Sequence, residues 1–237
     1  MDNIRTGEIH WKPIYKTGAI AALIFLLYSL ITMIQMFTLG GPPANAEEIF
    51  AMLQENRLLG LMRLDGLTLL VLPLYYLIYL GFFVALRNQN KAYAFLGAAL
   101  LMAGLTMVLA TPTAFSLASL SDKYLAAASA AEQERFLSAG EALLAANMWQ
   151  GSGAMLGRLL MLIAGLIGSA MMLKSPAFSR FTAYTGLGAH GFDLIHGIGV
   201  FLAWQGGYML MAIAGTLYLF WFPLLAWNLF KLAKTPN

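Results

Sequence analysis

Three polar side chains lie inside a hydrophobic segment near the C-terminal end of the chain. His190, Asp193 and His196 occur in the stretch 186–203, GLGAHGFDLIHGIGVFLA, at a spacing that puts them on one stripe of a helix. A carboxylate in the middle of a membrane costs roughly 2.5 to 3.5 kcal/mol, so Asp193 needs a partner or a water-filled cavity. A histidine beside a carboxylate can also exchange protons near neutral pH. The pattern predicts a polar centre for ligand binding or proton transfer.

Two other hydrophobic segments supply charges that could join this centre. Asp193 lies about 15 Å from either end of its span at 1.5 Å per residue, and Arg158 lies at a matching depth, roughly 13 to 15 Å below the outer face. We therefore expect an Asp193–Arg158 ion pair, with His196, Arg63 and Asp65 closer to the outer surface. Such a set would form either an outward-facing polar pocket, which binds a headgroup or relays protons, or a buried ion pair that only fixes helix register.

Metal binding at this centre is not expected. On one helix, His190 and His196 lie ~9 Å apart along the axis and point in different directions, so one ion cannot bind both. The chain has no cysteine, which excludes disulfides and thiolate metal sites. No residue pattern identifies a cofactor.

Aromatic residues offer another kind of site. They could line a pocket for a flat apolar molecule such as a quinone or a pigment, although such residues more often form the core of a helix bundle. The residues concerned are Tyr75, Tyr76, Tyr79, Tyr218 and Trp221.

Composition defines the class of protein. Of the 237 residues, 60% are hydrophobic and only 11% are charged, far from the ~25% charged residues of a soluble domain. The apolar segments extend along the whole chain, so we expect one integral membrane domain over residues 1–237. The net charge of +3 comes from basic residues near helix ends, which excludes a nucleic-acid face and makes the lipid bilayer the expected partner.

The hydrophobic segments predict an all-α membrane protein with six spans. Amphipathic helices are expected between them, on the outer side of the membrane: one at 46–57, started by Asn45 and Glu48, and one or two within 121–147, with a second capping pair at Ser129 and Glu132. Proline should kink or interrupt the second span at Pro73 and the sixth at Pro223. The expected spans are 18–39, 58–86, 92–110, 148–173, 181–204 and 208–230.

Basic residues predict the orientation. Six spans put both termini on one side, and the loops of that side carry most of the lysines and arginines, which favours a cytoplasmic location for both termini. The basic residues of that side are Arg5, Lys12, Lys16, Arg87, Lys91, Lys174, Arg180, Lys231 and Lys234. Only Arg57, Lys123 and Arg135 fall in loops of the other side. This pattern predicts a multi-pass membrane protein with both termini in the cytoplasm.

Several stretches resemble one bacterial family of multi-pass membrane proteins, known as domain of unknown function 4386. They are the second span at 58–87, the polar segment 119–145 with its Ser-Asp-x-Tyr motif, and 171–187 with its Met-Leu-x-Ser motif. The resemblance covers most of the chain and implies a six-span membrane protein without an assigned activity. The polar fifth span departs from the family's pattern.

The leading hypothesis is a non-enzymatic membrane protein that binds or passes a small amphiphilic ligand. Its ligand would contact an outer-facing pocket formed by Arg63, Asp65, Arg158, His190, Asp193 and His196. One alternative is an intramembrane enzyme that uses Asp193 and His196 as an acid–base pair. Another is a structural subunit of a larger membrane complex or a homo-oligomer, with glycine-rich helix faces as docking surfaces.

Overall fold

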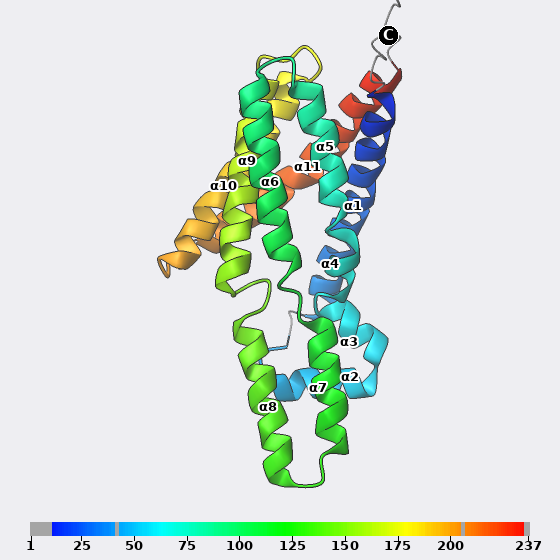
Figure 1. The fold of residues 1–237 in the computed structure, drawn as a ribbon, viewed down its shortest axis with the longest axis vertical. Coiled ribbons are helices and arrows are strands. Elements are labelled where there is room, and N and C mark those ends of the chain that lie inside the picture. Colours follow the sequence, from blue (N-terminus) through cyan, green and yellow to red (C-terminus); the bar gives the residue numbers. More distant parts are fainter. Residues whose placement is uncertain (1–10, 41–42, 205–206, 235–237) are drawn as a thin grey trace, which may run out of the picture.

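All regular structure in the described chain is helical. The computed structural model describes residues 11–40, 43–204 and 207–234, and no strand occurs among them. Arg5, one of the basic residues that predict the orientation, lies outside these residues. The helices are α1 (Lys12–Leu39), α2 (Ala46–Glu55), α3 (Arg57–Arg63), α4 (Gly66–Val71), α5 (Leu74–Leu86), α6 (Lys91–Leu109), α7 (Ala114–Ala126), α8 (Ala130–Ala145), α9 (Ser152–Met172), α10 (Arg180–Phe201) and α11 (Gly207–Lys234) (Figure 1).

Four segments of the described chain are long and apolar enough to cross a membrane, which marks the protein as a membrane protein. They are Lys12–Leu39, Lys91–Ala126, Ser152–Met172 and Met209–Lys234. Each contains most of one expected span, namely the first, third, fourth and sixth. The fifth expected span forms α10, which is long enough at 22 residues but is made less apolar by its histidines and Asp193.

The second expected span is not one helix but three. The helical structure is interrupted between α3 and α4 and again at Leu72 and Pro73, before α5 begins at Leu74. Pro73 has no N–H and so cannot donate a helical backbone bond. Just after it, the N–H of Tyr75 bonds to the carbonyl of Leu72, only three residues back, at 3.0 Å. The break expected at Pro73 is thus confirmed. α5 alone has 13 residues, about 20 Å of helix, so a crossing at this point needs α4 as well.

The interruption expected at Pro223 is wrong. Helix α11 continues through this proline from Gly207 to Lys234. Prolines are tolerated inside membrane helices because neighbouring groups compensate for the missing backbone bond. The unbroken α11 places its side chains against both α1 and α10.

The six long helices α1, α5, α6, α9, α10 and α11 form one group, which we call the bundle. Within it α6 and α9 lie side by side and meet at two glycines (Figure 1). A Cβ atom on Gly104 would overlap the carbonyl of Gly157, and one on Gly157 would overlap the carbonyl of Gly104. Glycine permits this close approach, as small residues do in membrane helix pairs. α1 begins and α11 ends at the same end of the bundle (Figure 1).

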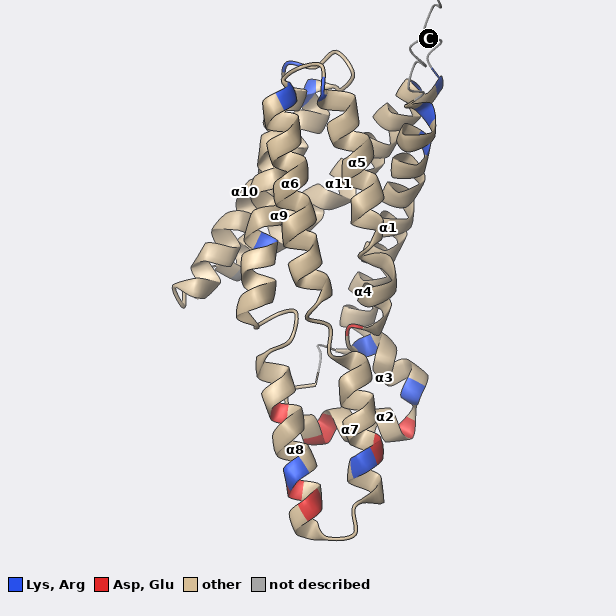
Figure 2. Cartoon of the chain, in the orientation of Figure 1, with Lys and Arg blue, Asp and Glu red and all other residues tan. Residues whose placement is uncertain are grey.

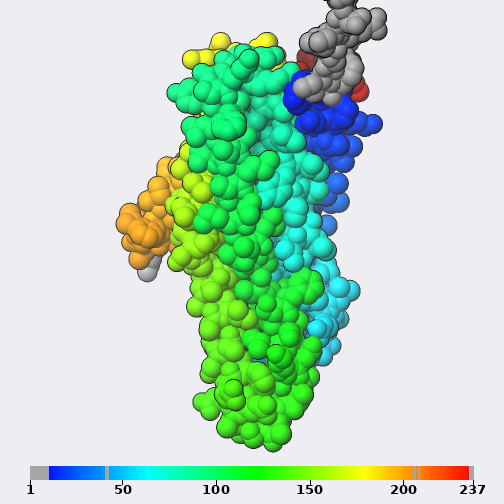
Figure 3. Space-filling model, viewed as in Figure 1, coloured from blue at the N-terminus to red at the C-terminus, as the bar shows by residue number. Residues whose placement is uncertain are grey.

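The short helices α2, α3, α7 and α8 form a second group at the opposite end, which we call the end unit (Figure 1). It has its own small core, formed by Ile49, Phe50, Leu53, Leu117 and Ala118. Most acidic side chains of the described chain lie in the end unit, together with Arg57, Lys123 and Arg135, whereas the far end of the bundle carries basic side chains without acidic ones (Figure 2). Seen as a surface, the molecule is elongated, and the C-terminal end of α10 projects from its side (Figure 3).

Both expected capping pairs of the end unit are confirmed. Asn45 accepts a bond from the N–H of Glu48 at 2.9 Å, and Ser129 accepts one from the N–H of Glu132 at 3.3 Å. The expected helix 46–57 ends earlier, at Glu55. The next residue, Asn56, caps the start of α3. Each helix start is therefore stabilised by residues of its own first turn.

An exposed ion pair links two helices of the end unit. Arg57 donates to the carboxylate of Asp122 at 2.7 Å. This hydrogen bond lowers the pKa of the Asp122 carboxyl from its usual value. Both side chains are more than half exposed, so the pair adds little to stability.

Candidate functional site

The six residues expected to form one site lie in separate parts of the structure. Arg63 and Asp65 flank the break between α3 and α4, near α1, α2 and α7, whereas the other four lie on α9 and α10. α9 and α10 pack against each other, and α5 reaches this region with Tyr79. The structure thus brings Arg158, His190, Asp193 and His196 together and gives Arg63 and Asp65 other contacts.

Asp65 is a buried helix cap. One carboxylate oxygen accepts the N–H of Thr113 at 2.6 Å, and the other accepts the N–H of Ala114 at 2.7 Å. These are the first N–H groups of α7, where a negative charge is favoured. The carboxylate therefore links the break after α3 to the start of α7, and its position is explained by the fold.

Arg63 caps the C-terminal end of α1. Its guanidinium donates to the carbonyl of Leu39, the last residue of α1, at 2.8 Å. A cation is favoured at a helix C-terminus, where carbonyl groups lack partners within the helix. This contact fixes α3 against the end of α1.

His190 is buried and bonded through both ring nitrogens. Nδ1 lies 2.7 Å from the carbonyl of Gly186, which can only accept, so Nδ1 carries a proton. Nε2 lies 2.8 Å from the hydroxyl of Tyr79, which therefore donates to the neutral imidazole. Gly165 of α9 makes room for the ring, since a Cβ atom there would overlap it. These contacts join α5, α9 and α10 at one level.

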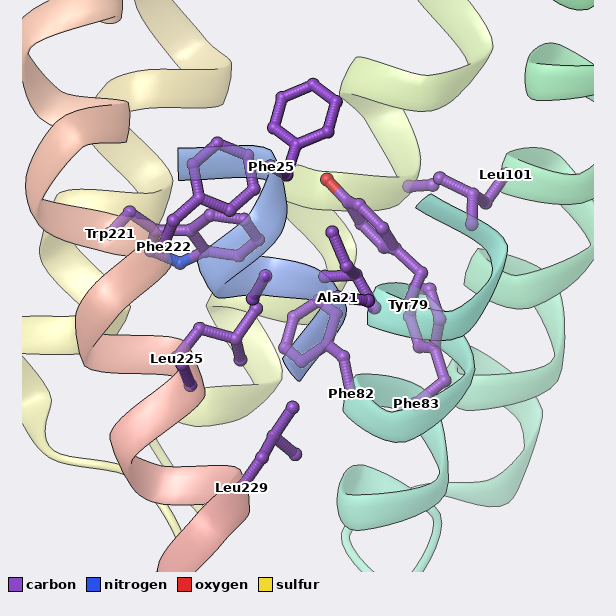
Figure 4. Close-up of a cluster of buried hydrophobic side chains, with 14 of the residues drawn as sticks. Ala21, Phe25, Tyr79, Phe82, Phe83, Leu101, Trp221, Phe222, Leu225 and Leu229 are labelled. Carbon is purple, nitrogen blue, oxygen red and sulfur yellow. The ribbon is translucent and has the colours of Figure 1, made fainter. Parts of the chain in front are cut away.

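Three of the aromatic residues proposed as a pocket lining, Tyr79, Tyr218 and Trp221, contact His190 in the core of the bundle. The imidazole meets Trp221 edge to face at 4.9 Å and Tyr218 at 5.2 Å between ring centroids. Tyr79 and Trp221 are buried beside Phe25 and Phe222 (Figure 4). Edge-to-face contacts of this kind stabilise packing, and here they make the aromatic group a filled core.

Asp193 lies one turn further along α10 and is half-buried. Its carboxylate interacts with the hydroxyl of Tyr218 through a side-chain hydrogen bond and with Arg158 and His196 through electrostatic attraction. The expected Asp193–Arg158 ion pair is not formed, because the charged groups do not approach within 4.0 Å. The guanidinium of Arg158 instead lies over the ring of Trp149, at 5.8 Å from its centroid.

His196 joins the end of α10 to the start of α11. Its Nδ1 lies 3.0 Å from the carbonyl of Gly207 and donates to it. The side chain is buried. In the described part of the chain, no three metal-ligating side chains of His, Cys, Asp or Glu come together.

Sequence reasoning missed two polar groups in the same region. The hydroxyl of Ser169 on α9 and the indole N–H of Trp221 on α11 are fully buried without a hydrogen-bond partner. Both lie beside Gly186, where a Cβ atom would overlap them. Sequence alone gives no signal for such a meeting, because the three residues come from three helices.

No family model matches the chain, and comparisons with curated proteins and with solved structures give no match. The resemblance to domain of unknown function 4386 therefore stays a prediction.

Proposed function

We propose that the chain crosses a bacterial inner membrane six times, with both termini in the cytoplasm. The shared end of α1 and α11 and the basic residues at that end support this orientation (Figures 1 and 2). α10 can serve as a crossing because its histidines face inward, whereas Ile195 and Ile198 are exposed to lipid. α5 completes a crossing together with α4. The acidic end unit then lies at the outer surface.

The function we propose is binding, or passage, of a small amphiphilic ligand whose headgroup lies between Arg158 and Asp193. The observation that carries this proposal is that an arginine and an aspartate lie half-buried in the bundle without forming a direct ion pair with each other. Charges at this depth are costly unless they are paired or hydrated. A headgroup with a cationic end on Asp193 and an anionic end on Arg158 would satisfy both charges.

The surroundings of the two charges suit an amphiphile. Arg158 and Asp193 are only half-buried, and the outer faces of α9 and α10 carry exposed apolar side chains, namely Leu156, Ile195 and Ile198. A lipid tail could lie against these outer faces while the headgroup reaches the charges. The ligand would then enter sideways from the membrane.

Native mass spectrometry of the mildly solubilised protein tests this function. We expect the wild type to retain a small amphiphile, and we expect Asp193→Asn and Arg158→Gln each to lose it. Asp122→Asn is the matched control, since it removes a carboxylate from the exposed pair of the end unit. Equal retention by all four proteins, or by none, would contradict the proposed function.

The alternatives from the sequence remain predictions. An acid–base enzyme would use Asp193 with His196, whose Nδ1 is bonded to the Gly207 carbonyl. A subunit of a larger complex would carry co-purifying proteins, which the same mass spectra would show.

A further inference from the structure

A stripe of polar groups runs along the inner side of α10. It consists of Thr182, the carbonyl of Gly186, His190, Asp193 and His196, which follow one another at three or four residues. The stripe extends ~21 Å along the helix axis, about two thirds of the ~30 Å hydrocarbon core. Polar groups buried along a membrane helix often mark ion or proton pathways.

Hydroxyl groups form the section of the stripe nearest the basic end of the bundle. Thr182 is fully buried, and its Oγ1 lies 2.9 Å from the hydroxyl of Ser179. The side-chain amide of Asn228 on α11 donates to the same oxygen at 3.1 Å. Ser179 begins α10, so this section connects the interior to the helix end.

The next section contains Ser169 and Trp221 beside Gly186. Buried polar groups nearly always have hydrogen-bond partners, and an internal water molecule commonly supplies them where protein does not. The hydroxyl of Ser169 and the indole N–H of Trp221 lie beside the same residue, Gly186, and offer two polar contacts, the smallest number that one buried water molecule needs.

The remaining section of the stripe contains His190 and Asp193, and titratable groups of the neighbouring helices face it. His190 contacts Tyr79 of α5 and Tyr218 of α11, and α9 offers only the backbone of Gly165. The groups that interact with Asp193 are Tyr75 and Tyr79 of α5, Arg158 of α9, His196 of α10 and Tyr218 of α11. The carboxylate of Asp193 thus bonds to the hydroxyl of Tyr218, and the imidazole of His190 bonds to that of Tyr79.

We propose that this stripe is a proton path through the bundle, with Asp193 and His190 as its proton-binding groups and a water molecule at Ser169 and Trp221 as the carrier beyond them. The path goes beyond ligand binding, because it connects the charged site to the basic end of the molecule.

Each step moves one proton and no electron, and two of the steps follow hydrogen bonds of the structure, Tyr79 to His190 and Thr182 to Ser179. Tyr79 gives its hydroxyl proton to Nε2 of His190 and regains one from the side of Asp193. Nδ1 of the resulting imidazolium leaves the carbonyl of Gly186 and releases its proton to the bound water, which passes one on to the hydroxyls of Thr182 and Ser179. A turn of the imidazole ring then restores its original tautomer.

The test is proton flux into vesicles of phosphatidylethanolamine and phosphatidylglycerol that contain the purified protein and an internal pH dye. With a potassium gradient and valinomycin as driving force, we expect the wild type to acidify the vesicles faster than protein-free vesicles do. Asp193→Asn and Tyr79→Phe should each reduce this rate by about a hundredfold, as expected when a proton-transfer group is lost. Ser169→Ala should reduce it severalfold.

Thr216→Val is the matched control, because the Thr216 hydroxyl on α11 is exposed and bonds only to the carbonyl of Ala212. It should conduct like the wild type. Tyr79→Phe keeps the aromatic ring, so an intact thermal unfolding profile separates loss of conduction from loss of folding. A wild-type rate equal to that of protein-free vesicles, or an unchanged rate in Asp193→Asn or Tyr79→Phe, would overturn the proposal.

The same variants separate this path from ligand binding. Ser169→Ala and Tyr79→Phe leave Arg158 and Asp193 in place, so they should retain the amphiphile in native mass spectra while conduction falls. Conduction without any bound amphiphile would leave the path intact and contradict the proposed function.

Discussion

The end unit and the bundle satisfy their polar groups in different ways. In the end unit, Asn45 and Ser129 cap helices through residues three positions away, so the partners are neighbours in the sequence. In the bundle, Tyr79 and His190 are 111 residues apart and meet only because α5 and α10 pack around the same core. The end unit also contains contacts between distant residues, such as the exposed pair of Arg57 and Asp122, but the buried network around His190, which can carry a function, lies in the bundle.

The largest expected effect tests the bundle core that holds this network. Trp221→Ala should lower the free energy of unfolding by about 3–5 kcal/mol, because Trp221 is fully buried against His190, Tyr79 and Phe222. The measurement is thermal or denaturant unfolding in mild detergent. Trp227→Ala on the same helix is the control, since Trp227 is largely exposed and its loss should change little. Equal effects of the two variants would show that the core does not depend on this contact.

A middle-sized effect tests the connection between the two regions. Asp65→Ala should cost about 2–4 kcal/mol, because two buried backbone N–H groups, those of Thr113 and Ala114, lose their acceptor. Hydrogen exchange should show faster opening at the start of α7, with the centre of α10 unchanged. An opening confined to α10 would mean that Asp65 belongs to the functional centre instead.

The smallest expected effect tests the local caps. Asn45→Ala should cost about 1 kcal/mol, since the N–H of Glu48 loses its cap within a single turn. Exchange should rise at the start of α2 alone. A rise that spreads into the bundle would contradict the independence of the two regions.

Much of the architecture could be predicted from the sequence because its causes are local. Apolar length and composition predicted an all-helical membrane protein, the capping pairs located the starts of α2 and α8, and Pro73 located a break. The continuity of α11 through Pro223 could not be predicted in the same way, since the effect of a proline depends on the helices packed around it.

The candidate site was predicted only in part. Helical spacing correctly placed His190, Asp193 and His196 on one stripe, but depth along a helix does not specify rotation about its axis. Arg158 therefore lies near Asp193, as expected, but does not form the expected ion pair with it.

The sequence by itself determined the class of protein, the helical segments and the polar character of α10, because these follow from composition and from spacing within single segments. Only the tertiary structure decided that Asp65 caps α7, that Tyr79 bonds to His190 and that Ser169 and Trp221 meet at Gly186. These contacts join residues of different helices, and their existence depends on how the helices pack.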